Sequence, residues 1–437
     1  MTHRNPTIHT SLLFDPQQKA FLPNRSITVD PESGLITKVF HRENEDDINP
    51  VDIDLRHLAL VLPGLIDAHT HIFLHPYSEA SSTIQMRDES PIERTIRAVT
   101  HVRKALLAGY TTYRDLGTEA MADADVGVRD AINRGLIPGP RLFVATQAIA
   151  SSGGYEVHGE NSQTRMPAAS DVADGVDGVR RVVRRRIGVG ADVIKVYADY
   201  RRRVMRFPPP LTENGADVQF PPVCGVGISD MEARNPNYLQ FSQEEMNALV
   251  DEAERADCPV AAHCVSNQAV IMAAKAGVLS IEHGKNVDEE TLSVMKEHGC
   301  IFVPTLAVME LSLGGNKEKM APILRSTKRA WELGVELACG GDTGTFAHGD
   351  NVRELELMVM AGVPLEDILR AATIGGWKAC GGERCGRNFG WLGKGCAADI
   401  IGLDADPRCD SNALRKVAFV MKDGRIWKRD GEAVGMI

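Results

Sequence analysis

The amino-acid sequence predicts an α/β fold: a (β/α)8 TIM barrel with a small composite β-sandwich domain built from both termini. Three observations lead to this prediction. Short apolar runs alternate with amphipathic segments through the middle of the chain, which is typical of a parallel sheet. The number of such runs is eight, which closes a barrel around a core of side chains. Several runs are followed by residues able to bind a metal ion, as in barrels with active sites at the strands' carboxyl ends.

The eight predicted barrel strands are short and rich in apolar residues. In chain order they are Leu60–Ile66, Thr111–Asp115, Arg141–Ala148, Val193–Tyr197, Val260–His263, Leu279–Glu282, Ile301–Pro304 and Val335–Cys339. Helices are predicted between them, among others at Ile92–Ala108, Asp174–Val189, Gln243–Ala256, Gln268–Ala276 and Glu289–His298. A doubly wound open sheet is the alternative, but no G-x-G-x-x-G or P-loop motif follows a strand.

Both ends of the chain carry β-rich segments separated by turns. Examples are Ile8–Phe14 and Leu35–Phe40 near the start, and Ala398–Leu403 and Val417–Met421 near the end. Neither end is large enough for a core of its own. We therefore expect residues 1–62 and 395–437 to share one β-sandwich domain, with residues 63–394 forming the barrel.

Bulk properties exclude several classes of protein. The net charge of −10 argues against nucleic-acid partners and anionic membranes, both of which require a basic surface. The basic stretch 180–186 is interpreted as a solvated helix face, with nucleic-acid binding as the alternative. The segment Met1–Pro23 is largely polar, and no apolar run approaches the ~18–20 residues of a membrane span. We expect a soluble, cytoplasmic protein.

Two further features have open interpretations. The nine cysteines contain no C-x-x-C pair, which predicts reduced thiols. A zinc clip is the alternative for the closest group, Cys380, Cys385, Cys396 and Cys409. The Pro- and Asn-rich insertion at 201–240 is interpreted as a lid, a binding loop or a disordered segment.

Two histidines end the first predicted barrel strand, in G-L-I-D-A-H-T-H. Side chains two apart in a strand share a face, so His69 and His71 would point together toward the barrel mouth and bind one ion. An isolated H-x-H pair is more often a chance pair in a turn. The interpretation as ligands depends on the same placement recurring at four other strands.

Lys195 lies within the apolar run D-V-I-K-V-Y, where an unpaired ammonium is costly to bury. One interpretation is an inward lysine paired with a carboxylate. We favour a lysine with a lowered pKa that reacts with CO₂. The resulting N6-carboxylysine would be an anionic, two-oxygen ligand able to bridge two metal ions, and the other candidate ligands supply no bridging group.

Three further candidates end later strands. His263 lies in V-A-A-H-C, His283 in I-E-H-G and Asp342 in C-G-G-D-T-G. Each alone could be an ordinary core histidine or a turn aspartate. Together, His263 and His283 would complete the ligands of a second ion. Asp342 could bind metal and also hydrogen-bond the attacking water.

Candidate substrate contacts lie in the loops after the third and eighth predicted strands and at the end of the fourth strand. They are Tyr155, His158, Tyr197 and His348. His75 and His101 are expected at the surface.

These motifs together resemble the amidohydrolase superfamily. They are P-G-L-I-D-A-H-T-H, G-Y-T-T-Y-R-D-L-G, D-V-I-K-V-Y-A, A-A-H-C, S-I-E-H-G, V-P-T-L, G-G-D-T-G and A-A-D-I-I-G-L-D-A-D-P. Within it the chain is similar to binuclear metal-dependent imidodipeptidases and carboxypeptidases, which include prolidase-like Xaa-Pro dipeptidases and ochratoxin amidases. The resemblance covers nearly the whole chain.

The resemblance implies a division of the ligands. His69, His71 and Asp342 would hold one ion, His263 and His283 the other, and carboxylated Lys195 would bridge them. It also implies the terminal β-sandwich and assembly into a homo-oligomer. Family members often carry a histidine directly after the Gly-Gly of the third-strand loop. Here Tyr155 takes that place, which puts the substrate contacts in doubt.

The predicted chemistry is metal-assisted hydrolysis. Zn²⁺ suits these ligands best, with Mn²⁺, Co²⁺ or Ni²⁺ feasible. A metal-bridging hydroxide would attack an amide carbon, and Asp342 would move the proton to the leaving nitrogen. We predict a hydrolase for a small N-acyl amino acid, dipeptide or aromatic amide. The alternatives are a cyclic-amide or lactone hydrolase, a non-hydrolytic enzyme on the same metal site, and a catalytically inactive scaffold.

Overall fold

The computed structural model describes residues 5–43, 48–157, 166–201 and 237–435. A nine-stranded sheet contains strands from both ends of the chain. Its order is β21-β20-β19-β18-β5-β1-β2-β3, with β4 paired to β1. The strands are β1 (Thr7–Asp15), β2 (Ala20–Asp30), β3 (Leu35–His41), β4 (Ile53–Asp54), β5 (Leu60–Pro63), β18 (Ile400–Leu403), β19 (Val417–Lys422), β20 (Arg425–Arg429) and β21 (Glu432–Ala433).

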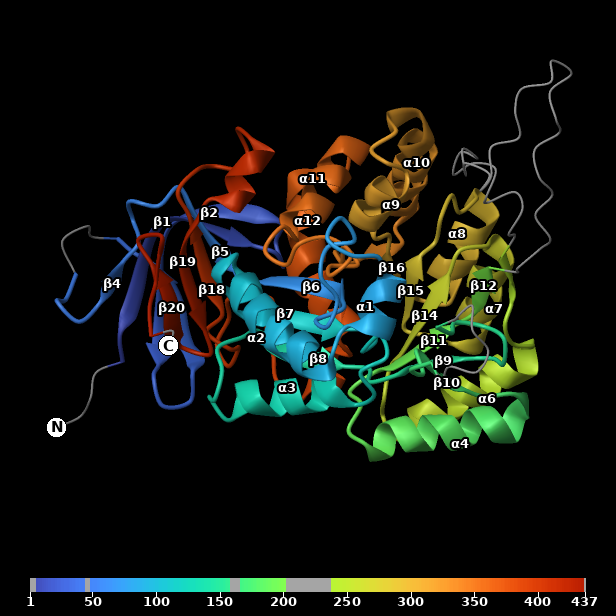
Figure 1. Ribbon diagram of the computed structural model, residues 1–437. Coiled ribbons are helices and arrows are strands. Elements are labelled where there is room, and N and C mark those ends of the chain that lie inside the picture. Colours follow the sequence, from blue (N-terminus) through green and yellow to red (C-terminus); the bar gives the residue numbers. More distant parts are fainter. Residues whose placement is uncertain (1–4, 44–47, 158–165, 202–236, 436–437) are drawn as a thin grey trace, which may run out of the picture.

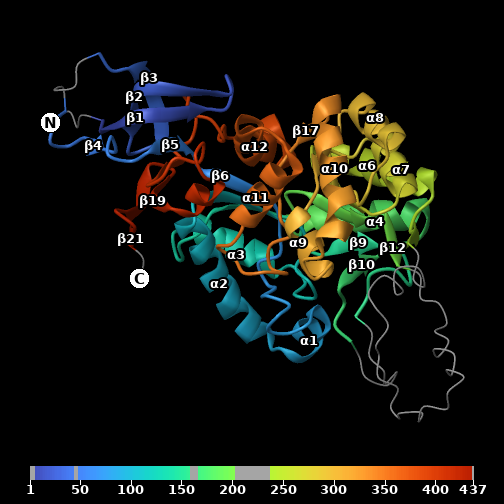
Figure 2. The same cartoon turned by 90° about the horizontal axis from the view of Figure 1, so that it is seen from above.

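Strands distant in sequence lie side by side in this terminal sheet, as Figures 1 and 2 show for the blue and red strands. β18 pairs antiparallel with β5, with Ile401 opposite Leu62. One apolar cluster combines both ends of the chain, including Ile8, Ile27 and Phe419. The two ends therefore share a sheet and a core, as expected. The sandwich arrangement and the domain boundaries stay predictions.

The middle of the chain forms parallel strands in two sheets. The first contains β6 (Leu65–Thr70), β7 (Tyr110–Asp115) and β8 (Arg141–Val144). The second has the order β10-β9-β11-β14-β15-β16-β17, with β9 (Ala148–Ala150), β10 (Ser170–Val172), β11 (Ile194–Tyr197), β14 (Val260–Cys264), β15 (Ser280–His283), β16 (Ile301–Val303) and β17 (Glu336–Leu337). A separate hairpin pairs β12 (Asp199–Arg201) with β13 (Asn237–Leu239).

Backbone hydrogen bonds join these two parallel sheets at both ends. On one side, Ala68 N donates to Cys339 O over 2.8 Å, so β6 contacts the residues that follow β17. On the other side, Asp192 N donates to Val144 O over 2.8 Å, so β8 contacts the residues before β11. Strands of the first sheet are therefore linked to both flanks of the second.

Helices surround the parallel strands (Figures 1 and 2). They are α1 (Ser82–Asp88), α2 (Pro91–Leu107), α3 (Ala124–Asn133), α4 (Gly175–Gly188), α6 (Gln243–Glu254), α7 (Asn267–Ala276), α8 (Glu289–Glu297), α9 (Leu306–Ser312), α10 (Lys317–Leu333), α11 (Val352–Ala361), α12 (Leu365–Arg370) and α13 (Gly376–Ala379), with a π-turn at Ala371–Gly375 and short 3₁₀ turns at Gly382–Cys385 and Ser411–Arg415. The five helices named from the sequence are all present. Side-chain caps explain some of their starts, such as the capping box of Ser242 and Glu245.

Two predicted strands are each divided in two. The segment predicted as Leu60–Ile66 becomes β5 in the terminal sheet and β6 in the parallel sheet. Gly64 separates them, and a Cβ at this position would lie only 2.1 Å from the hydroxyl oxygen of Thr111. The segment predicted as Arg141–Ala148 becomes β8 and β9, divided near Thr146, which has a left-handed φ of 62°. Both departures follow from local backbone requirements that apolar patterning does not reveal.

Arg141 connects the parallel strands to the terminal sheet. Its guanidinium donates to Asp399 over 2.8 Å and to Asp423 over 2.7 Å. We expect Arg141→Met to lower the free energy of unfolding by about 2–3 kcal/mol, because the carboxylate of Asp399 stays buried without its cation. Breaking an ion pair in which both partners are fully buried would lower it further. Urea denaturation would measure the change. Arg329→Met, which removes an exposed pair with Glu289, is the control, and an equal loss in both variants would contradict the prediction.

No helix within the described ranges is both long and apolar enough to cross a membrane.

Candidate metal centre

The candidate ligands lie at one end of the parallel strands. His69 is in β6, Lys195 in β11, His263 in β14 and His283 in β15, while Asp342 follows β17. Carboxyl ends of parallel strands share one edge, so these side chains converge although they are far apart in sequence.

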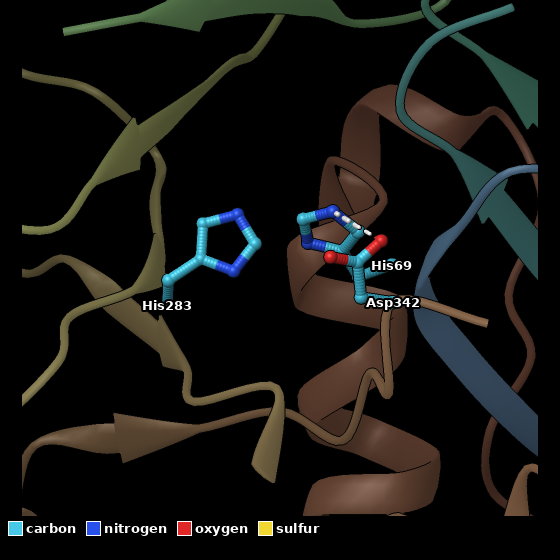
Figure 3. Close-up of side chains that lie close together, drawn as sticks. All are labelled: His69, His283 and Asp342. Carbon is cyan, nitrogen blue, oxygen red and sulfur yellow. Dashed lines mark ion pairs between the residues drawn. The ribbon is translucent and has the colours of Figure 1, made fainter. Parts of the chain in front are cut away.

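Three of the predicted ligands form a compact group. One ligand atom each from His69, His283 and Asp342 lies within 4.8 Å of the other two. In Figure 3 the carboxylate of Asp342 lies beside the imidazole of His69, and the ring of His283 lies across from them. The Nε2 atom of His69 is 3.7 Å from Oδ1 of Asp342. Two imidazoles and a carboxylate at this spacing can hold a divalent cation.

The other two histidines adjoin this group. His71 Nε2 lies 3.2 Å from Oδ1 of Asp342. The ring centroid of His263 is 4.5 Å from that of His283. The structure therefore brings together all four predicted histidine ligands and Asp342.

Lys195 is buried in the same region, with only 2% of its surface exposed. Its Nζ has no hydrogen-bond partner, and it forms no ion pair within the described part of the chain. Burial lowers the pKa of Lys195. The alternative of a lysine paired with a carboxylate is therefore not what the structure contains. An uncharged amine is the form that can add CO₂.

In three of the histidines, a hydrogen bond to the Nδ1 atom fixes the orientation of the ring. Nδ1 of His69 donates to Glu282 over 2.8 Å, and Nδ1 of His71 donates to the carbonyl of Gly117 over 2.9 Å. Nδ1 of His283 hydrogen-bonds the hydroxyl of Thr305 over 2.8 Å. These contacts leave Nε2 available as a metal ligand. Nε2 of His69 is buried and has no hydrogen-bond partner among the residues that the structure describes, which fits a ligand atom.

The protonation states of the group differ from residue to residue. Burial raises the pKa of Asp342, but the neighbouring His69 and His71 outweigh burial and hold this pKa well below its usual range. Burial lowers the pKa of His69 to about 4. For His71 the contact with Asp342 and nearby carboxylates outweighs burial and raises the pKa to about 9. Asp342 is thus held as an anion, the form that binds a cation.

Two ligands have an unusual backbone conformation. His283 has a φ of 74° and Asp342 a φ of 62°. Left-handed conformations are disfavoured for residues other than glycine and concentrate at functional sites. The turn around Asp342 also requires Gly344, where φ is 122° and a Cβ would lie 2.4 Å from the carbonyl oxygen of His71. The C-G-G-D-T-G segment can therefore approach β6 closely.

The predicted substrate contacts are placed differently from one another. Tyr155 and Tyr197 stack with ring centroids 4.5 Å apart, and Tyr197 lies 4.7 Å from the ring of His263. His348 is instead buried against His101, with centroids 4.4 Å apart. His158 and most of the 201–240 insertion lie outside the described residues.

The sequence analysis did not predict the burial or the contacts of several polar residues. His75 and His101 were expected at the surface, but 2% and 7% of their surfaces are exposed. His75 lies 2.7 Å from Glu89, so it is buried with a polar partner. Glu119 accepts a hydrogen bond from the hydroxyl of Tyr155. No sequence pattern indicates these pairings, because the partners lie 14 and 36 residues apart, beyond the spacing of neighbours within one helix or strand.

The zinc clip considered for four cysteines has no support. Cys380 and Cys385 lie in one apolar cluster and Cys396 in another, while Cys409 is exposed. Within the described ranges, the group around Asp342 is the one set of His, Cys, Asp or Glu residues spaced to hold a metal ion.

Comparisons with known proteins agree with the motifs and the geometry. The sequence profile of the amidohydrolase family matches residues 60–427. An ochratoxinase from Aspergillus niger is 32% identical over 411 residues, covering 86% of this chain and 77% of the relative.

Solved structures show the same relationship. A Xaa-Pro dipeptidase with bound methionine in its active site is 28% identical and superposes with a TM-score of 0.78, covering 97% of this chain and all of that one. The A. niger ochratoxinase structure is 27% identical with a TM-score of 0.75, covering 98% of this chain and 96% of that one. The chain therefore belongs to the amidohydrolase family, and its relatives include the ochratoxinase and Xaa-Pro dipeptidase that the sequence motifs indicated.

Proposed function

We propose that this protein hydrolyses the amide C–N bond of a small molecule, such as an N-acyl amino acid or a dipeptide. The observation that carries the proposal is the group of His69, His283 and Asp342, whose ligand atoms lie within 4.8 Å of one another. Two relatives support the type of bond. One is named an ochratoxinase, and the other is named a dipeptidase, an enzyme that cleaves the peptide bond of a dipeptide.

We infer that the parallel strands form a closed (β/α)8 barrel and that the terminal sheet folds into the β-sandwich. Hydrogen bonds between β6 and the residues after β17, and between β8 and the residues before β11, support closure. Amidohydrolase-fold relatives that superpose over nearly the whole chain support it further.

The proposed centre holds two divalent ions. His69, His71 and Asp342 would bind one ion, His263 and His283 the other, and Lys195, carboxylated on Nζ, would bridge them. Zn²⁺ suits nitrogen and oxygen ligands of this kind, and Mn²⁺, Co²⁺ or Ni²⁺ are compatible. When bound, such ions make water a nucleophile near neutral pH and polarise the carbonyl under attack.

Asp342 has the geometry of the proton carrier. Its carboxylate borders His69 and His71 at the edge of the group and is 14% exposed, so a water molecule and a substrate can reach it. We propose that Asp342 accepts the proton of the attacking water and passes it to the leaving nitrogen. Tyr155 and Tyr197, stacked beside His263, would border the substrate.

A panel of substrates tests the proposal. Metal-loaded protein would be offered N-acyl amino acids, Xaa-Pro dipeptides, ochratoxin-like aromatic amides and lactones of similar size. Release of a free amine from at least one amide is the expected result. Turnover restricted to lactones would favour the alternative of a lactone hydrolase, and no turnover of any compound would contradict a hydrolase of these bonds.

Removal of metal should abolish activity and weaken the fold. Chelator-treated protein is expected to lose turnover and to regain it at roughly two ions per chain, the content of a binuclear centre. An ion at a hundredfold excess over its Kd stabilises the native state by about 2.7 kcal/mol, so the melting temperature should rise on reloading. Elemental analysis and thermal melts measure both effects. Full activity after complete chelation would contradict the metal centre.

Self-association into a homo-oligomer and a cytoplasmic location stay predictions. Light scattering on the purified chain would test the first of these.

A further inference from the structure

A buried ion pair lies directly behind His69. Arg114 in β7 donates from Nη2 to Oε1 of Glu282 in β15 over 2.7 Å, and 0% of either side chain is exposed. The other carboxylate oxygen, Oε2, accepts the hydrogen bond from Nδ1 of His69 in β6 over 2.8 Å. We propose that the Arg114–Glu282 pair is a positioning device that fixes the tautomer and the direction of His69 toward the metal centre. This inference rests on the proposed function.

Both oxygens of Glu282 are committed, so the carboxylate cannot move. Oε1 accepts from the hydroxyl of Ser280 over 2.5 Å as well as from Arg114. Ser280 and Glu282 are two apart in β15, so their side chains share one face of the strand. Because Ser280 and Arg114 both hold Oε1, the position of Oε2 is also fixed. In that position Oε2 contacts Nδ1 of His69.

Arg114 is fixed in turn by the backbone. Its Nε donates to the carbonyl of Ala68 over 2.6 Å, and its Nη1 donates to the carbonyl of Ala379 over 2.9 Å and to the hydroxyl of Ser280 over 2.9 Å. Ala68 directly precedes His69. The guanidinium therefore holds both the strand that carries His69 and the carboxylate that binds its ring.

This arrangement determines which nitrogen of His69 can bind a metal. A carboxylate accepts but does not donate, so Nδ1 carries the hydrogen and Nε2 presents its lone pair to the centre. The other two fixed histidines hydrogen-bond uncharged groups through Nδ1: the carbonyl of Gly117 for His71, with a carboxylate oxygen of Glu119 farther away at 3.6 Å, and the hydroxyl of Thr305 for His283. Of these three, His69 is the one whose Nδ1 contacts a carboxylate within a buried ion pair.

Glu282→Asp tests the role with the charge retained. The shorter side chain can keep Arg114 but withdraws from Nδ1 of His69. Loss of an outer carboxylate partner costs 10–100-fold in metal affinity, so we expect one of the two ions to bind about 10–100-fold more weakly. Competition with a chelating dye measures the affinity, and the visible spectrum of the Co²⁺-loaded protein reports the changed ligand field. The matched control is Glu336→Asp in β17, two strands from β15 in the same sheet, which shortens a carboxylate paired with Arg370 of α12.

A second variant separates positioning from stability. Replacing both partners, Arg114→Met with Glu282→Leu, removes the pair without leaving a buried charge unpaired. The double variant should fold and show the same loss of affinity and the same spectral change. The proposal would be overturned if the variants melted at a lower temperature but kept the wild-type affinity for both ions and the wild-type Co²⁺ spectrum. Failure of both variants to fold would also overturn it. Wild-type protein that binds no metal would instead refute the proposed function itself.

Discussion

Asp342→Asn is expected to keep the fold but to reduce kcat by about 10²–10⁴-fold, the usual contribution of a general acid–base group. Asparagine retains an oxygen in place of Oδ1, which lies 3.2 Å from His71 and 3.7 Å from His69. It cannot accept a proton from water, however. Much of the metal should therefore stay bound while turnover is lost. Steady-state kinetics and elemental analysis on the same preparation measure both quantities.

Asp350→Asn is the matched control for this variant. Asp350 lies in the same loop, its side chain is 60% exposed, and it pairs with Arg415 at the surface. Its replacement should leave kcat near the wild-type value. An Asp342→Asn protein that turns over substrate at the wild-type rate would show that another group carries the proton.

Lys195→Met is expected to cost at least one of the two ions and most of the activity. Methionine fills the same buried volume, and 2% exposure of Lys195 makes an apolar replacement compatible with the fold. It cannot form a carbamate, so the proposed bridge between the ions is lost. We expect kcat to fall by about 10²-fold or more, the scale set by loss of metal-assisted water activation.

The chemical modification of Lys195 can be measured directly. Acid treatment of wild-type protein should release CO₂ in proportion to its metal content, and the Lys195→Met protein should release none from this position. Lys328→Met is the control, because that lysine is 45% exposed on α10. Wild-type protein that releases no CO₂, together with a Lys195→Met protein that keeps both ions, would refute the bridging role.

Most of the secondary structure followed from local patterning. The amphipathic periods predicted the helices from α2 to α8 that were named, with boundaries within one or two residues for most of them. Buried apolar runs predicted the parallel strands. The divisions at Gly64 and Thr146 were missed, since a short apolar run does not reveal where a strand changes sheets.

The ligand set was also predictable, because a polar residue at the end of a buried strand is costly unless it has a function. His69, His283 and Asp342 came together on this basis. Their detailed directions were not predictable. In a regular strand, successive side chains point to opposite faces, so the side chains of Glu282 and His283 in β15 would point apart. The left-handed φ of 74° at His283 changes this direction, and both side chains lie beside His69.

Residues that act from behind the ligands had no sequence signal. Arg114 and Glu282 belong to strands β7 and β15 and are 168 residues apart in the chain, so only the tertiary structure brings them together as an ion pair. The same holds for Tyr155 and Glu119, which join two loops.

The sequence by itself determined the α/β class, the shared terminal sheet and the identity of the candidate ligands, because these depend on local periodicity and on residue types at strand ends. Its motifs also carried the resemblance that indicated the family. The tertiary structure decided which nitrogen of His69, His71 and His283 is left for the centre, that Lys195 forms no ion pair with a carboxylate of the described residues, and that His348 packs against His101. Those properties depend on contacts between residues far apart in the chain, and on left-handed backbone positions such as Asp342 that patterning cannot indicate.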